Sequence, residues 1–265
     1  IELSTEIGRK VIRAGFSTAW ISWIHMENFS AWHNVPIGTK GNGFGGLDTE
    51  FVFNSPLHVK HIQHLADWQK EKIFIYGGRR NLGNAKFQTG QVAMYTESSA
   101  GYAGMKANSK FEFGTSFLPY WPDAKGAPQN TIIGGASLWV LQGHSAEEYK
   151  GVAAFFNYIS KAEVQSDWHQ FTGYLPITTA AYEYTKKQGV YNENPDMETA
   201  LKQMTMHKPT ANSKGLRFGN FVQMRGIMYD EFEAIFAGQM TAQQGLDEAV
   251  VNGNKLLRKF QKMYE

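Results

Sequence analysis

The stretch from residue 16 to residue 32 is rich in tryptophan, and a run of glycines follows it closely. Trp20 and Trp23 stand there beside polar residues. In such a setting, flat indole faces commonly pack against the C–H groups of polyols and sugars or bind a quaternary ammonium. The alternative is ordinary core packing, which we predict for Trp68 and Trp139 because both lie on apolar faces. For Trp20 and Trp23 the composition leaves both interpretations open.

Two segments have features that suggest a functional role, and the first of them is typical of an anion site. A predicted strand over 92–95 leads into the small and hydroxyl-bearing residues of 96–101, an arrangement that presents hydroxyls and backbone N–H groups ahead of a helix. A second predicted strand over 131–133 runs directly into Gly134 and Gly135. Glycines within a strand pattern suggest that the backbone comes close to another group.

The basic residues are dispersed rather than concentrated. The chain has 26 basic and 24 acidic residues and a net charge of +2. Nucleic-acid binders usually have a concentrated basic face, so no nucleic-acid partner is predicted. Arg225 lies on the polar side of a predicted helix, where position alone favours a solvated side chain. The densest basic cluster has helical spacing and is interpreted as the solvated side of a helix: Lys255, Arg258, Lys259 and Lys262.

Histidines recur at every third position of the helix predicted over 56–72. His58, His61 and His64 are followed at the same interval by Asp67, which invites a metal-site hypothesis. Steps of three drift around a helix of 3.6 residues per turn, so the four side chains cannot converge on one ion. We therefore expect surface histidines and no metal.

Signatures of cofactor binding and catalysis are weak. Gly41, Gly43 and Gly46 match the spacing of a dinucleotide fingerprint, but no clear strand precedes them and a strand-like segment follows. The sequence has no G-x-S-x-G elbow, no H-E-x-x-H pair and no cysteine. A carboxylate pair for glycoside hydrolysis stays open, because its members need not be close in the chain. The motifs favour a binding protein without a cofactor over an enzyme.

Helical and strand patterns alternate along the chain, which predicts an α/β fold. Amphipathic periodicity and capping residues, among them Ser55 and Thr241, predict helices over the following ranges: 2–13, 56–72, 145–160, from about 181, 221–236 and from 241. Runs rich in β-branched and aromatic residues predict strands over 73–76, 92–95, 131–133 and 138–141.

The length of 265 residues suits one large domain or two modest lobes. No apolar run approaches the ~20 residues of a membrane span. The chain begins at Ile1 without a Met, a signal peptide or a lipobox. We expect an N-terminally truncated piece of a longer precursor.

Four stretches together resemble the periplasmic glycerol-3-phosphate-binding proteins of bacterial ABC importers, which belong to the extracellular solute-binding proteins. They are WISWIHMENFSAW (20–32), APQNTIIGGASLWV (127–140), WHQFTGYLPIT (168–178) and KGLRFGN (214–220). The resemblance covers nearly the whole chain and needs few gaps.

The resemblance implies the type II periplasmic-binding fold, in which two α/β lobes joined at a hinge close on a ligand. By analogy with the family's chain path, residues 1–125 and 176–265 build the C-terminal lobe. Residues 126–175 are then a returning segment of the N-terminal lobe together with the hinge crossings. Most of that lobe would precede Ile1, so we expect it to have been removed or to lie on another chain. The apolar edge at 131–140 would then seek a partner.

The resemblance also implies a set of ligand-binding residues: Trp20, Trp23, Ser98, Gly135, Tyr174 and Arg225. Arg225 can present its planar guanidinium to phosphate oxygens, and Ser98 and Tyr174 can donate hydroxyls. Gly135 lets a backbone N–H approach without a side chain in the way, and the indoles can cover glycerol carbons.

The implied function is capture of a phosphorylated polyol in the periplasm and its delivery to the permease subunits of an importer, without a covalent step. The expected ligands are glycerol 3-phosphate and glycerophosphodiesters such as glycerophosphocholine. A binding protein for a neutral oligosaccharide is the alternative. Arg225 separates the two, because a neutral sugar needs no bidentate cation.

Overall fold

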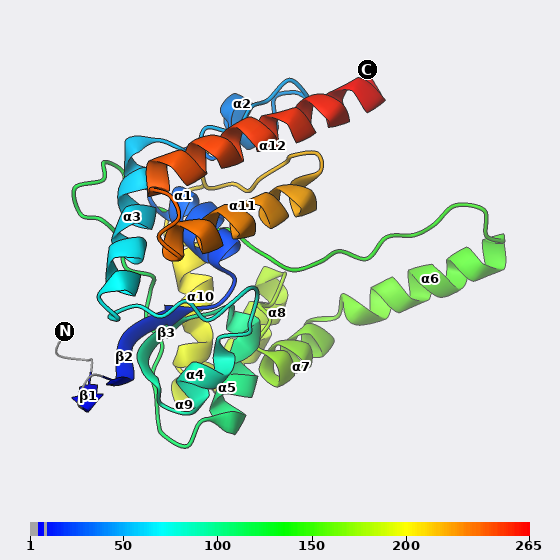
Figure 1. Ribbon diagram of the computed structural model, residues 1–265. Helices are drawn as coiled ribbons and strands as arrows, with labels where there is room; N and C mark the ends of the chain where they lie inside the picture. The colour runs from blue at the N-terminus through cyan, green and yellow to red at the C-terminus, as the bar shows by residue number, and fades with distance from the viewer. Residues whose placement is uncertain (1–4, 8–9) are drawn as a thin grey trace.

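The computed structural model describes residues 5–7 and 10–265 (Figure 1). Within these residues the sheet has three strands in the order β1-β2-β3: β1 (Thr5–Ile7), β2 (Lys10–Thr18) and β3 (Val92–Thr96). β1 pairs antiparallel with β2, and β2 runs parallel to β3. β3 confirms the strand predicted there, and the strand–helix alternation confirms the α/β class.

The helix predicted over 2–13 is wrong in the part that the structure describes. Residues 10–18 form β2 instead. The adjacent Val11 and Ile12 are β-branched and favour an extended backbone, and pairing with β3 satisfies the backbone hydrogen bonds. The few apolar residues at helical spacing were too weak a signal to outweigh this tertiary pairing. Residues 1–4 and 8–9 of the predicted helix lie outside the described residues.

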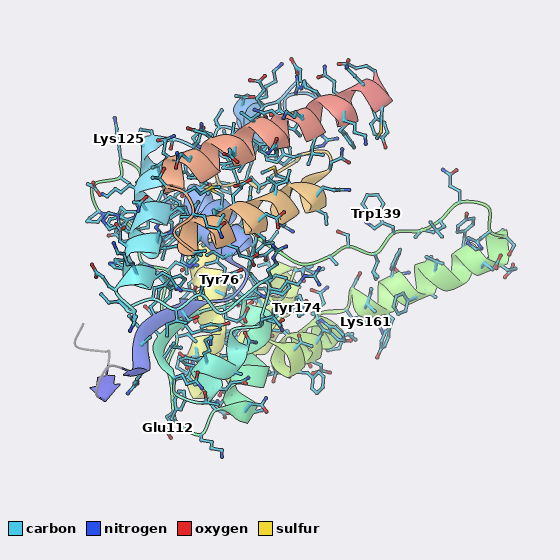
Figure 2. The ribbon with its side chains drawn as sticks, viewed as in Figure 1. Tyr76, Glu112, Lys125, Trp139, Lys161 and Tyr174 are labelled. Carbon is cyan, nitrogen blue, oxygen red and sulfur yellow. The ribbon has the colours of Figure 1, made fainter. Side chains whose placement is uncertain are left out.

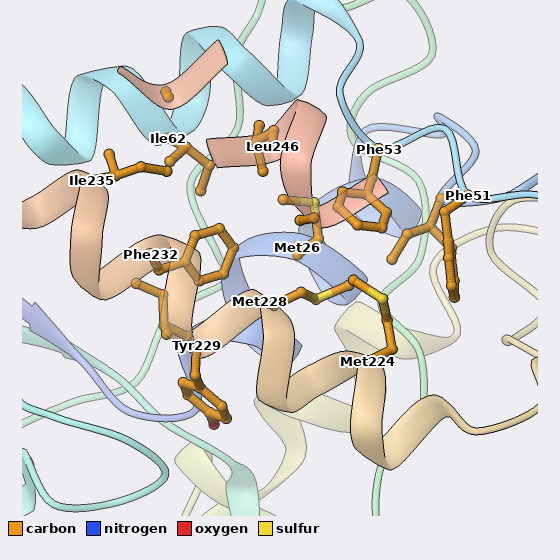
Figure 3. Close-up of a cluster of buried hydrophobic side chains, with 14 of the residues drawn as sticks. Met26, Phe51, Phe53, Ile62, Met224, Met228, Tyr229, Phe232, Ile235 and Leu246 are labelled. Carbon is orange, nitrogen blue, oxygen red and sulfur yellow. The ribbon is translucent and has the colours of Figure 1, made fainter. Parts of the chain in front are cut away.

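Three long helices form the main helical layer, as the sequence predicts: α3 (Pro56–Lys70), α11 (Phe221–Phe236) and α12 (Ala242–Tyr264). α11 packs along α12, and both contact α3. Their apolar faces meet side chains from the segment after β2 in one buried cluster (Figure 3), whose members include Ile21, Met26, Phe51, Phe53, Ile62, Met224, Met228, Phe232 and Leu246. Trp68 packs against this cluster, as predicted.

Shorter elements complete the body of the molecule. Between β2 and α3 lie a π-helix (Trp23–Asn28), α1 (Phe29–Trp32) and α2 (Thr39–Asn42). The shorter helical elements after α3 are, in chain order, α4 (Asn84–Gln88), a 3-10 turn (Ser99–Gly101), α5 (Tyr102–Asn108), α7 (Ala162–Thr172), α8 (Thr179–Lys187), α9 (Val190–Glu193) and α10 (Asp196–Met204). The sequence prediction omitted α7 and α10. The residues that these two helices bury are mostly polar, among them Gln165, Ser166 and Gln203, so they show no apolar stripe.

Residues 131–160, which we name the arm, project from the body (Figure 1). Its first part is extended but unpaired, so the strands predicted at 131–133 and 138–141 are absent from the described structure. A strand needs a neighbour to satisfy its backbone groups, and none lies beside the arm. The segment 73–76 likewise forms only a single bridge, between Phe16 and Phe74.

The second part of the arm is α6 (Ala146–Ile159), which confirms the helix predicted over 145–160. None of its residues is buried, although the helix carries an apolar set. Trp139, predicted to be in the core, is 87% exposed on the extended part (Figure 2). The core prediction is wrong because nothing in the described chain covers this side chain. None of the described helices has the length and apolar character to cross a membrane.

Candidate ligand-binding site

Trp20 and Trp23 sit at the turn where β2 ends and the π-helix begins. Trp20 has a φ of +43°, a left-handed conformation that a bulky residue rarely adopts, and its backbone N–H donates to the carbonyl of Arg80 at 2.7 Å. Such outliers and π-helical turns concentrate at functional sites. The indole Nε1 of Trp23 is buried and has no hydrogen-bond partner in the described structure. The backbone therefore holds both indoles in a constrained arrangement.

Glu97 and Ser98 lie directly after β3, where the sequence predicts an anion site. The Glu97 carboxylate accepts the Ser98 backbone N–H at 2.7 Å. It also accepts a hydrogen bond from the side chain of Trp20. The Asn84 side-chain amide donates to it as well, at 2.6 Å, when the amide is oriented so that its nitrogen faces the surrounding acceptors. Burial raises the pKa of Glu97 to about 7. Ser98 Oγ accepts the N–H of Ala100 at 3.3 Å, which leaves its own proton free to donate.

Glu97 thus links two residues of the predicted set, Trp20 and Ser98. The sequence analysis did not single out this carboxylate. Its position at the carboxyl end of a strand, next to a predicted site residue, was the signal that was available.

Gly134 packs against the indole of Trp23, and Gly135 lies near Tyr174. A Cβ built on Gly134 would lie 2.8 Å from Cζ2 of Trp23. Gly135 has a φ of +105°, and Cε1 of Tyr174 would lie 3.7 Å from its Cβ. The close approach predicted for these glycines is therefore an approach to Trp23, and it places Gly135 beside Tyr174.

Tyr174 is also tied to the Ser98 segment. It follows Gly173, where a Cβ would come within 2.5 Å of the Ser99 carbonyl oxygen. The Tyr174 carbonyl accepts a hydrogen bond from Nδ1 of His169 at 2.5 Å. The structure therefore links five members of the predicted set through neighbouring residues: Trp20, Trp23, Ser98, Gly135 and Tyr174.

Arg225 lies in the second turn of α11, and its guanidinium is already engaged. Nε and Nη2 donate to the two carboxylate oxygens of Glu27, each at 2.6 Å. Cζ lies 5.1 Å from the centre of the Phe221 ring. Burial raises the pKa of Glu27 while Arg225 opposes this shift, and the hydrogen bonds to Glu27 raise the pKa of Arg225. The fork expected for a ligand is therefore partly occupied by a buried carboxylate that the sequence analysis missed.

The histidines expected at the surface instead pack against other segments, with His61 and His64 half-buried. His58 is buried, and burial lowers its pKa to about 3. Burial also lowers the pKa of His61 well below its ordinary value. The expectation is wrong because α3 is covered on this side by the segment 18–33 and by the loop that contains Trp121. No cluster of metal-ligating side chains occurs among the described residues.

The hydrogen bonds of these histidines form a network that runs in one direction. Trp121 Nε1 donates to Nδ1 of His61 at 3.4 Å, and His61 Nε2 lies 3.0 Å from Nδ1 of His25. His25 Nε2 lies 3.1 Å from Oγ1 of Thr18, whose own proton goes to the Ala19 carbonyl at 2.7 Å. His61 Nδ1 accepts from Trp121, so the proton of His61 is on Nε2 and is donated to His25 Nδ1. His25 then carries its own proton on Nε2 and donates it to Thr18, so both imidazoles are neutral. The chain of bonds ends next to Trp20.

Two cavities lie elsewhere in the described structure. One of about 430 Å³ is bordered by the glycine-rich loop and α12, with Phe44, Arg217 and Phe260 among its walls. Another of about 400 Å³ lies between α5 and α10. Neither is lined by a residue of the predicted set. Gly43 in the first cavity packs against the Arg217 carbonyl so closely that a side chain would not fit. This packing explains the glycine at position 43 without a nucleotide ligand.

Residues 6–199 match the family of bacterial extracellular solute-binding proteins. The chain belongs to this family. It is 50% identical over 250 residues to the sn-glycerol-3-phosphate-binding periplasmic protein of Pectobacterium atrosepticum, covering 94% of this chain and 56% of the relative. The corresponding protein of Yersinia pseudotuberculosis is 49% identical over 247 residues, covering 93% and 56%. This solute-binding chain therefore spans little more than half the length of these relatives.

Solved structures show the same fold. UgpB from Mycobacterium tuberculosis, in complex with glycerophosphocholine, superposes with a TM-score of 0.73 at 19% identity, covering 95% of this chain and 60% of that one. The maltodextrin-binding domain of Bdellovibrio bacteriovorus, bound to maltotriose, gives a TM-score of 0.72 at 16% identity, covering 97% and 64%. The periplasmic-binding fold predicted from the sequence is confirmed. At these identities the structures say nothing about the ligand of this solute-binding chain.

Proposed function

We propose that this chain is the larger part of a periplasmic solute-binding protein that captures glycerol 3-phosphate or a glycerophosphodiester and delivers it to the permease of an ABC importer. The observation that carries the proposal is the surface that joins Trp20, Trp23, Ser98, Gly135 and Tyr174, in a chain about half identical to proteins named for this ligand. Arg225, one helical turn beyond Phe221 on α11, supplies the cation.

Each group has a physical role in this proposal. The indoles cover the apolar C–H faces of the glycerol, and the phosphate oxygens receive hydrogen bonds from the Ser98 and Tyr174 hydroxyls and the Gly135 backbone N–H. The free N–H groups of Arg225 complete the phosphate site. No covalent step is involved, so the protein is a carrier and not an enzyme.

The second wall of the site is proposed to come from chain that is not part of this sequence. The arm exposes Ile133, Leu138, Trp139 and Leu141, a contiguous run of apolar side chains typical of a surface that another element covers. This agrees with the proposed division into lobes, in which residues 1–125 and 176–265 build the C-terminal lobe and residues 126–175 belong to the N-terminal lobe. Closure of the completed lobes would bury the ligand and present the closed form to the permease.

A neutral oligosaccharide is the second candidate, supported by the tryptophans and by the fold shared with maltodextrin-binding domains. Arg225 argues against a neutral sugar. Glu27 holds the guanidinium of Arg225 in place, and a fixed guanidinium forms strong hydrogen bonds with an anion, whereas a neutral sugar does not need a cation.

The test is calorimetric titration of the full-length protein with glycerol 3-phosphate, glycerophosphocholine and maltose in parallel. A phosphorylated ligand should bind and maltose should not. Arg225→Ala should weaken the phosphorylated ligand by about 100-fold, the scale of charge-assisted hydrogen bonds. Arg217→Ala, an exposed arginine outside the site, serves as the control and should leave the affinity unchanged. Binding of maltose alone would overturn the phosphate assignment.

A further inference from the structure

We propose that Glu27 is a positioning residue that sets the orientation and the effective charge of Arg225, so that the ligand is recognised by directed hydrogen bonds more than by net charge. The proposal rests on the proposed function, because it concerns the same anion site. Glu27 lies on the π-helix about one turn after Trp23. It comes from a different part of the chain than Arg225, 198 positions away in the sequence.

The geometry divides the guanidinium into two edges. A guanidinium has five N–H groups. Glu27 takes the one on Nε and one of the two on Nη2, through hydrogen bonds of 2.6 Å each. Both N–H groups of Nη1 and the second of Nη2 have no partner in the described structure. These remaining groups point along the edge that an oxyanion can bind end-on.

Burial shows which edge faces outward. The Glu27 side chain is 1% exposed, whereas that of Arg225 is 39% exposed. The edge shared with Glu27 therefore faces the inside of the protein, and the exposed part of the Arg225 side chain lies away from this carboxylate. The Phe221 ring, 5.1 Å from Cζ, restricts the guanidinium further. Two hydrogen bonds and an aromatic neighbour together leave Arg225 little rotational freedom before a ligand arrives.

The pair also carries no net charge. Desolvating a carboxylate is costly, and replacing a buried ion pair with apolar residues is often neutral or stabilising for a fold. Stability alone is therefore a weak reason for this pair. A role in which Glu27 holds a cation in one orientation at a binding surface accounts for both the burial of Glu27 and the partial exposure of Arg225.

The test is titration of the full-length protein with glycerophosphocholine at low and physiological ionic strength. Glu27→Gln should weaken binding about tenfold or more, because one of the two hydrogen bonds is lost and the guanidinium can rotate. The remaining binding should depend more steeply on ionic strength, because Arg225 is then an uncompensated charge that salt screens. A purely structural carboxylate would leave this salt dependence unchanged.

A double-mutant cycle makes the dependence on Arg225 explicit. In an Arg225→Ala background, Glu27→Gln should cause no further loss of affinity, since it acts through Arg225. If Glu27→Gln does not fold, Glu27→Asp keeps the charge but withdraws it by one methylene, and a smaller loss of affinity is expected. Glu27→Gln or Glu27→Asp that folds and binds as tightly as the wild type, with the same salt dependence, would overturn the proposal.

The molecule offers a matched control. Arg79 makes a similar bidentate pair with Glu233, through Nε at 2.9 Å and Nη2 at 2.6 Å. Asp230 also holds Nη2 of Arg79 at 2.6 Å, so Arg79 stays fixed when Glu233 is changed. Glu233→Gln should leave affinity and salt dependence unchanged. If Arg225→Ala itself has no effect on binding, the proposed phosphate site fails, and this outcome is distinct from a failure of the positioning role alone.

Discussion

α12 in the body and α6 in the arm begin in the same way. Thr241 forms a reciprocal capping box with Gln244 in α12, and Ser145 forms one with Glu148 in α6. Both helices carry apolar residues at helical spacing. α12 buries Leu246, Ala249 and Leu257, whereas no residue of α6 is buried.

The difference teaches that the local signals for a helix and the signals for its burial are independent. A capping box and a periodic pattern stabilise a helix wherever it stands. Burial needs a second surface, and the body provides one for α12 through α11 and α3, whereas nothing described covers α6. Within the described residues, the arm is therefore the part of the molecule whose apolar side chains stay exposed.

The largest expected effect contrasts one aromatic residue from each region. Phe232→Ala should lower the free energy of unfolding of the 265-residue chain by about 3–5 kcal/mol, because the fully buried ring leaves a cavity. Trp139→Ala should change it by no more than about 0.5 kcal/mol, because the indole is exposed. Chemical denaturation measures both. A large effect of Trp139→Ala in the proposed longer protein, but not in this chain, would show that additional residues cover the arm.

The next effect concerns pH and the histidine network of the body. Burial lowers the pKa of His25 from about 6.5 to about 3. The unfolded chain therefore binds the proton first, and stability falls as the pH drops below about 6.5 towards 3. His25 alone should cost about 2 kcal/mol between pH 7.5 and pH 5, at 1.36 kcal/mol per pKa unit.

Denaturant unfolding at pH 7.5 and pH 5 measures this loss. His25→Gln, which can keep one donor and one acceptor but does not titrate, should reduce the difference between the two pH values. An unchanged pH dependence in this variant would show that His25 does not titrate as the network requires.

The smallest effect compares the two capping boxes directly. Thr241→Ala should lower the free energy of unfolding by about 1 kcal/mol, the usual cost of a lost N-cap. Ser145→Ala should leave global unfolding unchanged, because α6 lies outside the packed body, but should speed amide hydrogen exchange in the first turn of α6. Equal effects of the two substitutions on global unfolding would show that the arm and the body unfold as one unit.

The members of the candidate site were predicted mainly through resemblance rather than through periodicity. Ser98 and the glycines at 134 and 135 had physical signals of their own, at the end of a strand and within a strand-like run. Arg225 had none, because an arginine on a polar helix face is ordinary until its partner is known. Glu27 and Glu97 were missed, since each acts on a residue that only the fold brings next to it.

The amino-acid sequence by itself determined the α/β class, the long helices α3, α11 and α12, the caps and the family. These features depend on side-chain periods and on contacts within a few residues. Only the tertiary structure decided that residues 10–18 form a strand, that His58 of α3 is buried, that Trp139 is exposed and that Glu27 holds Arg225. Those outcomes depend on surfaces distant in the chain, and a local pattern carries no information about which surfaces meet.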